Sequence, residues 1–72
     1  MNNLNVAKIQ LNGLPYEINT GTNLTQLLNR LKIQKNKVAI EINGEIVEKS
    51  KYTNLILNKD DKIEIVHFIG GG

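Results

Sequence analysis

The sequence has no cysteine and no tryptophan, and His67 is the only histidine among its 72 residues. Without cysteine the chain forms no disulfide and carries no thiolate nucleophile or metal ligand. A single histidine excludes a metal site built from several His and Cys side chains. We therefore expect no metal site and no catalytic residues in this chain.

A strong charge of one sign is also lacking, because nine Lys and Arg stand against seven Asp and Glu, for a net charge of +2. One Phe and two Tyr leave little for stacking on bases, so we expect no nucleic-acid partner. The densest basic run contains Arg30, Lys32, Lys35 and Lys37. Its simplest interpretation is a solvated helix end and loop, and the alternative is a functional patch.

Long apolar runs are absent as well. The longest are only a few residues, which is too short to span a membrane. Residues 1–5 have neither the basic region nor the apolar stretch of a signal peptide. We therefore expect no membrane partner, and a location in the cytoplasm or the plastid stroma.

What the sequence does contain is alternation of apolar and polar residues, the period of half-buried strands. Two Asn-Gly pairs, which tolerate positive φ, predict hairpin turns. Segment 48–54 has no clear period, but Tyr52 within it is expected to cover one end of the core. The predicted strands are 7–11, 16–18 (with Pro15 at its start), 38–42, 45–47 and 62–68, with turns at Asn12-Gly13, Asn43-Gly44 and 58–61, and 55–57 is either a short strand or a buried turn.

One helix is predicted between the two hairpins. Asn23 is a favourable N-cap, and Gln26 stands at the spacing of a capping box. Two to three turns are stable only when their apolar stripe packs on a sheet. The stripe consists of Leu24, Leu27, Leu28 and Leu31, at i, i+3, i+4 and i+7.

This order of elements predicts an α+β domain with one helix laid across a mixed sheet of four to five strands. The β-grasp, or ubiquitin-like, fold has this order. We expect a single β-grasp domain over residues 1–68 and a flexible C-terminal tail over residues 69–72.

The tail is the most informative segment, because the last strand leads directly into Gly70, Gly71 and Gly72. Fully extended, Ile69 to Gly72 reach about 13 Å, at roughly 3.3 Å per residue. Such an arm enters a narrow enzyme channel that a Cβ would block. The terminal carboxylate is a poor acyl group until it is activated, for example as an acyl-adenylate that sulfur then attacks. The chain has no phosphate-binding loop of its own, so another protein must be the catalyst.

Three segments resemble the ThiS family of sulfur carriers. They are 61–72, which holds the last strand and the glycines, 23–31 and 42–47. The resemblance extends from about Ile9 to Gly72. Two positions depart from it, since Glu48 stands where these chains often have proline and Asp60 where they have glycine. Asp tolerates left-handed backbone conformations better than most residues, so we expect the turn at Asp60 to survive.

The resemblance implies a carrier protein and not an enzyme. A ThiF-type, E1-like adenylyltransferase activates the terminal glycine with ATP and magnesium, and no cofactor is bound by the carrier itself. Sulfur from a donor such as a cysteine desulfurase makes a thiocarboxylate, which thiazole synthase (ThiG) uses for the thiazole of thiamine. Carried onto this sequence, Gly72 holds the thiocarboxylate, and Gly70 and Gly71 complete the tail motif.

A docking surface is predicted beside the tail. If Ile63 and Ile65 face the helix, Val66 and Phe68 point away from it, and with Ile69 they form an apolar surface. The alternative is that Phe68 folds onto neighbouring strands and completes the sheet. His67 is expected at the rim, without a chemical role.

Three other functions remain open at this point. One is that of the small subunit of molybdopterin synthase, another β-grasp carrier that ends in Gly-Gly. The chain is also compatible with a ubiquitin-like modifier of other proteins, or with a β-grasp interaction module whose tail is inert. The fold alone does not choose among them.

Overall fold

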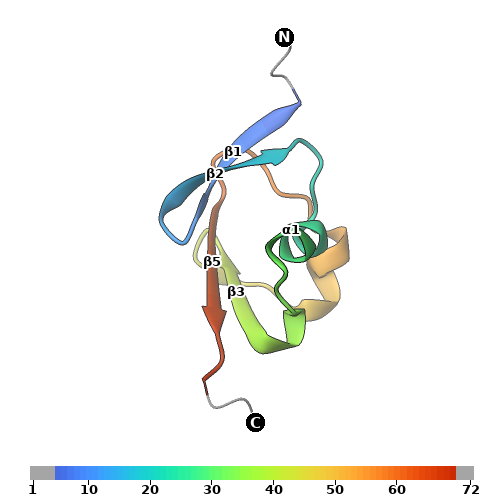
Figure 1. The fold of residues 1–72 in the computed structure, drawn as a ribbon, viewed down its shortest axis with the longest axis vertical. Coiled ribbons are helices and arrows are strands. Elements are labelled where there is room, and N and C mark those ends of the chain that lie inside the picture. Colours follow the sequence, from blue (N-terminus) through green and yellow to red (C-terminus); the bar gives the residue numbers. More distant parts are fainter. Residues whose placement is uncertain (1–4, 70–72) are drawn as a thin grey trace.

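The computed structural model describes residues 5–69, which form one mixed sheet and one α-helix (Figure 1). Strand order in the sheet is β2-β1-β5-β3-β4. β1 and β5 run parallel, and the other neighbours are antiparallel. This confirms the predicted architecture. The elements are β1 (Val6–Leu11), β2 (Leu14–Asn19), α1 (Leu24–Leu31), β3 (Val38–Ile42), β4 (Glu45–Ile46) and β5 (Lys62–His67), with short 3₁₀ helices η1 (Lys35–Lys37) and η2 (Lys49–Asn54).

The helix begins with the predicted capping box. The Gln26 N–H donates to Asn23 Oδ1 at 2.7 Å, and the Asn23 N–H donates back to Gln26 Oε1 at 2.9 Å. The helix ends at Lys32, whose left-handed backbone (φ 60°) turns its N–H onto the Asn29 carbonyl. Leu24, Leu27 and Leu28 are buried and Leu31 partly so, which confirms the predicted stripe.

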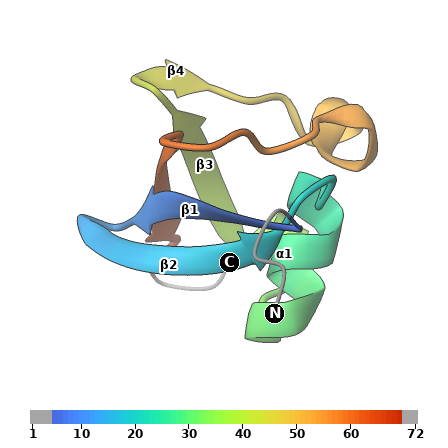
Figure 2. The ribbon, with the colours of Figure 1, turned by 90° about the horizontal axis from the view of Figure 1, so that it is seen from above.

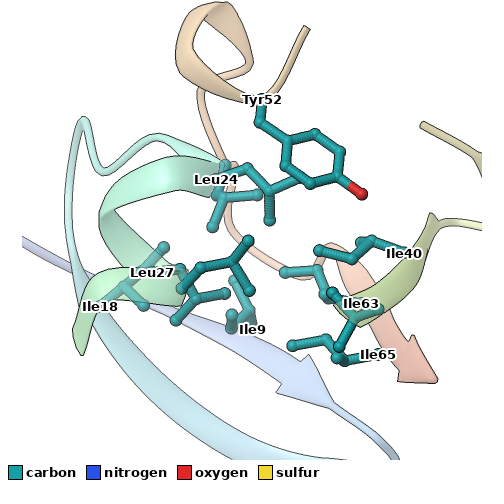
Figure 3. Close-up of a cluster of buried hydrophobic side chains, with 11 residues drawn as sticks. Ile9, Ile18, Leu24, Leu27, Ile40, Tyr52, Ile63 and Ile65 are labelled. Atoms are coloured by element: carbon teal, nitrogen blue, oxygen red, sulfur yellow. The ribbon is translucent and has the colours of Figure 1, made fainter. Parts of the chain in front are cut away.

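The core lies between α1 and one face of the sheet (Figure 2). Every second residue of each central strand contributes to it, as the period of two requires. η2 lies on the same side of the sheet as α1 and closes one end (Figure 3). The buried side chains are Ile9, Ile18, Val38, Ile40, Ile63 and Ile65 from the sheet, Leu24, Leu27 and Leu28 from α1, and Tyr52 and Leu57 from the connection to β5.

The connection over 48–61 contains more regular secondary structure than its sequence predicted. The 3₁₀ helix η2 places Tyr52 in the core, as expected, although its period was not recognisable. Segment 55–57 is only a single bridge, between Ile56 and Asn23, and it buries Leu57. Glu48 has a φ of −68°, the value that proline fixes, and Asp60 adopts the expected left-handed conformation at φ 70°.

Strand bounds differ slightly from the predicted ones. β2 begins at Leu14 and so includes Pro15, which pairs with Gln10. β2 is an edge strand, and the Thr20 N–H bonds to the Asn5 carbonyl. By alternation, the position of Pro15 faces the open edge, where the missing N–H is not needed. β5 ends at His67 and not at Phe68.

Tyr52 brings a polar group, its hydroxyl, into the core. Its side chain is 1% exposed, and its hydroxyl has no hydrogen-bond partner among residues 5–69. Burial raises the pKa of this hydroxyl above its ordinary value, because the phenolate loses its hydration. The unfolded chain therefore ionises first at alkaline pH, and stability that is present below the usual tyrosine pKa falls as the pH rises further.

We expect Tyr52→Phe to keep the free energy of unfolding at pH 7, or to raise it by up to about 1 kcal/mol, because no hydrogen bond is lost. The variant also loses part of the alkaline destabilisation. Urea unfolding at pH 7 and above about pH 10 measures both effects. Leu27→Ala, a core truncation that should cost about 2–5 kcal/mol, is the control. A clear loss of stability in Tyr52→Phe at pH 7 would show that the hydroxyl has a partner.

Candidate functional site

The candidate site is the end of β5, from which the chain leads into the glycines. β5 is the central strand of the sheet, so β1 and β3 flank it. Its pairing with β3 extends to His67, opposite Val38, and the Phe68 N–H still donates to the Lys37 carbonyl at 2.9 Å. The sheet therefore fixes the backbone up to one residue before Ile69.

Asn43, in the turn after β3, holds the start of β5. Its backbone N–H donates to the Lys62 carbonyl at 2.8 Å, and its side-chain Oδ1 accepts the Lys62 N–H at 2.9 Å. Its Nδ2 also donates to Asp61 Oδ1 at 3.0 Å. The left-handed backbone of Asn43 (φ 54°) is the conformation that places its side chain and N–H on the same neighbour.

Asn12, in the turn after β1, performs the same task nearer the tail. β1 pairs with β5 only at Gln10 and Leu11 before it turns away. The Asn12 N–H then donates to the Ile63 carbonyl at 2.8 Å. The side-chain amide accepts the Ile65 N–H at 2.7 Å and donates to the Ile65 carbonyl at 3.1 Å. The Asn12 side-chain amide thus takes the place of the next β1 residue in the sheet. It provides hydrogen-bond partners for the partly buried N–H and carbonyl groups of Ile65.

The predicted apolar surface lies at the end of β5 and on the two residues that follow it. Val66 is 57% exposed, Phe68 55% and Ile69 99%. Lys49 Nζ lies 5.4 Å from the centre of the Phe68 ring, and it donates to the Val38 carbonyl at 3.0 Å. The ring is therefore held beside the sheet while about half of its surface stays exposed, and its contact with a partner stays a prediction.

Two acidic residues lie next to this apolar surface on the same face. Glu41 of β3 stands directly opposite Glu64 of β5, and the corresponding pair nearer the tail is Ala39 and Val66. Like charges in directly opposed positions weaken a sheet slightly. Within residues 5–69 no group of three His, Cys, Asp or Glu side chains could hold a metal ion.

The remaining predicted site residues are His67 and the three final glycines. His67 is exposed and lines a hollow of about 330 Å³ with Ile65, Leu11, Leu31 and neighbouring residues, which places it at the rim as expected. Gly70, Gly71 and Gly72 lie outside the described residues, so the predicted tail motif and thiocarboxylate position stay predictions.

Comparison with known proteins gives the family. The ThiS family model matches residues 9–72, which include the last strand and all three final glycines. This chain belongs to the ThiS family. The ThiS crystal structure from Geobacter metallireducens superimposes with a TM-score of 0.78 at 32% identity, over 90% of this chain and 99% of that one. The predicted ubiquitin-like β-grasp fold is thereby confirmed.

Curated relatives agree with the ThiS assignment. The sulfur carrier protein ThiS of Bacillus subtilis is 41% identical over 66 residues, 89% of this chain and 98% of that protein. A thiazole synthase of Magnetococcus marinus is 48% identical over 65 residues, 90% of this chain but 20% of that protein. The chain thus spans about a fifth of the length of that synthase.

Sequence reasoning missed three residues that bond to β5 or to the neighbouring strand β3. Asn12 and Asn43 were recognised as turn residues only, and their bonds to β5 join positions up to 53 residues apart. Lys49 lay in a segment without a period. The only available signal was the use of Asn, whose side chain both donates and accepts, in both turns.

We expect Asn12→Gly to lower the free energy of unfolding by about 1–3 kcal/mol, because the turn keeps its positive φ but Ile65 loses two hydrogen bonds. Hydrogen exchange should accelerate at the Ile65 amide. Asn43→Gly is the matched control, in which exchange accelerates at Lys62 instead. Equal protection of Ile65 in wild type and Asn12→Gly would contradict the assigned role.

Proposed function

We propose that this protein carries sulfur on the carboxyl group of Gly72, as a substrate of other enzymes and not as a catalyst. The observation that supports this most directly is the exposed apolar end of β5 immediately before the glycines, in a chain whose ThiS family match extends to residue 72. The fold fixes the strand up to Phe68 and leaves Ile69 almost fully exposed, so a partner has access to the chain where it leaves the sheet.

The proposed chemistry takes place in two steps. A carboxylate oxygen of Gly72 attacks the α-phosphorus of ATP, and magnesium pyrophosphate leaves. Hydrosulfide, or a persulfide whose S–S bond a thiol then reduces, attacks the acyl carbon of the adenylate, and AMP leaves with the oxygen. A thiocarboxylate remains on Gly72. Glycine suits this reaction because its acyl carbon has no side chain beside it.

This chemistry requires three partners. A ThiF-type adenylyltransferase carries out the activation, and a donor such as a cysteine desulfurase supplies the sulfur. Thiazole synthase (ThiG) is the acceptor. Its part is supported by the thiazole synthases of Magnetococcus marinus and Paramagnetospirillum magneticum, each of which matches this chain over 20% of its own length. The compartment, cytoplasm or plastid stroma, stays a prediction, and no helix among the described residues is long and apolar enough to cross a membrane.

Val66, Phe68 and Ile69 are proposed to contact the activating enzyme. Exposed apolar side chains next to a reactive tail add little to the stability of the free protein, whereas their burial in a complex is favourable by about 25 cal/mol per Å². The large exposed ring of Phe68 is the best anchor among them, because aromatic residues are frequent in the energetic centre of interfaces.

We expect the intact protein to gain the mass difference between sulfur and oxygen when it is incubated with ATP, magnesium, a sulfur donor and a ThiF-type enzyme. Fragmentation should place the gain on Gly70-Gly71-Gly72, which distinguishes it from oxidation of Met1. A thiol-reactive alkylator should label the product, since the chain has no cysteine. Deletion of Gly72 is the control.

Three other results would contradict the proposal. No gain with any competent activating enzyme would favour an inert interaction module. Conjugates of high mass in cell lysate would indicate a protein modifier. Transfer of sulfur to a molybdopterin synthase large subunit, and not to thiazole synthase, would assign the carrier to molybdopterin synthesis.

We expect Phe68→Ala to weaken binding to the activating enzyme by at least about tenfold, while the free energy of unfolding changes by no more than about 1 kcal/mol. Titration calorimetry and urea unfolding measure the two quantities. Ile56→Ala is the matched control, since Ile56 is also half exposed (48%) but belongs to the connection between η2 and β5. Equal affinities of the two variants would remove Phe68 from the interface.

A further inference from the structure

Three lysines lie in the short segment that connects α1 to β3 and reaches the end of β5. Lys37 is next to the tail, because its carbonyl accepts the Phe68 N–H at 2.9 Å. Lys35 belongs to the same 3₁₀ turn, η1. Lys32 stands between Leu31 and Ile33, which line the same hollow as His67. All three side chains are exposed. We call Lys32, Lys35 and Lys37 the basic rim.

The charge of the basic rim is not neutralised within the fold. From residue 18 to residue 40 the sequence contains no Asp or Glu. Across residues 5–69, no ion pair joins a rim lysine to a carboxylate. The neighbouring cations are different, because Arg30 lies 5.4 Å from the centre of the Tyr16 ring and Lys49 contacts Val38 and Phe68.

Charge is balanced at the start of β5, where Lys59 and Lys62 accompany Asp60 and Asp61, and it is not balanced at the basic rim. Asp60 and Asp61 precede the strand, at the end opposite the basic rim. The six residues of β5 separate these ends by about 20 Å, at roughly 3.3 Å per residue. Glu41 is nearer, about 13 Å from Lys37 at roughly 3.3 Å per residue along β3. Both distances exceed the screening length of about 8 Å at physiological salt, so these acids do not cancel the positive potential of the rim.

We propose that the basic rim docks on an acidic protein surface around the opening through which the activating enzyme receives the tail. This inference rests on the proposed sulfur-carrier function. A carrier must reach one enzyme, leave it and find the next. Complementary charge suits this cycle, because it raises the association rate more than it prolongs the complex. Exposed lysines, which keep their hydration and mobility, act in this way.

A protein surface fits the basic rim better than nucleic acid does. Among the described residues, Phe68 is the one exposed ring beside the rim, because Tyr52 is buried and Arg30 lies over the Tyr16 ring, whereas single-strand binding needs several aromatic platforms beside the cations. The tail itself must enter the activating enzyme, so the residues next to it come into contact with the rim of that opening in any productive complex.

The test compares two double charge reversals, Lys35→Glu/Lys37→Glu in the rim and Lys51→Glu/Lys59→Glu away from it. Each Lys→Glu substitution changes the net charge by −2, so the net charge of the protein falls from +2 in the wild type to −2 in either double variant. All four side chains are exposed, and circular dichroism checks that the variants fold. Stopped-flow association with a ThiF-type enzyme that activates the wild type is measured at about 0.05 M and about 0.5 M salt.

We expect the rim variant to associate at least about tenfold more slowly than the control variant at low salt, and the difference to disappear at high salt. Equal rates for the two variants would overturn the inference, as would a difference that salt does not reduce. Salt-sensitive binding of an oligonucleotide by the wild type, lost only in the rim variant, would assign the rim to nucleic acid instead. If the wild type itself gains no sulfur, the proposed function fails, which is a separate result.

Discussion

The position of the central strand, β5, depends on two asparagine side chains that hold it. β5 has only two register pairs with its parallel neighbour β1, and those are at its start. Beyond them, the amide of Asn12 supplies the hydrogen bonds that a further β1 residue would have made. Asn43 does the same for the first residue of β5 from the opposite side. Because each Asn also forms its own turn, the two hairpins and the central strand are fixed together.

The features that the sequence predicted are those with a local cause. The leucine stripe and the Asn23–Gln26 capping box span only a few residues, so helix α1 and its first residue were recognisable. Alternation likewise identified the strands. The bonds from Asn12 to Ile65 and from Lys49 to Val38 connect distant segments, and no short pattern indicates them. Because the Asn-Gly turn signal already explains an asparagine at positions 12 and 43, the hydrogen bonds from these side chains to β5 could not be recognised from the sequence.

One strand serves both the core and the candidate site. Ile63 and Ile65 are buried against α1, whereas Val66 points from the opposite face and Phe68 comes two residues later. This division results from the period of two, since a residue that faces the core alternates with one that faces away. A change of the exposed residues therefore alters the proposed contact surface without a cavity in the core. The buried residues in turn fix the direction in which the chain leaves the sheet.

The end of β5 is flanked by two surfaces that contribute to binding in different ways. The apolar surface formed by Val66, Phe68 and Ile69 gains free energy only when a partner excludes water from it, so it governs how long a complex lasts. The basic rim acts at a distance and governs how often partners meet. A carrier that must leave one enzyme for the next needs frequent encounters but only a modest lifetime. A small apolar contact combined with a hydrated cationic rim provides that balance, whereas a larger apolar contact alone would slow release.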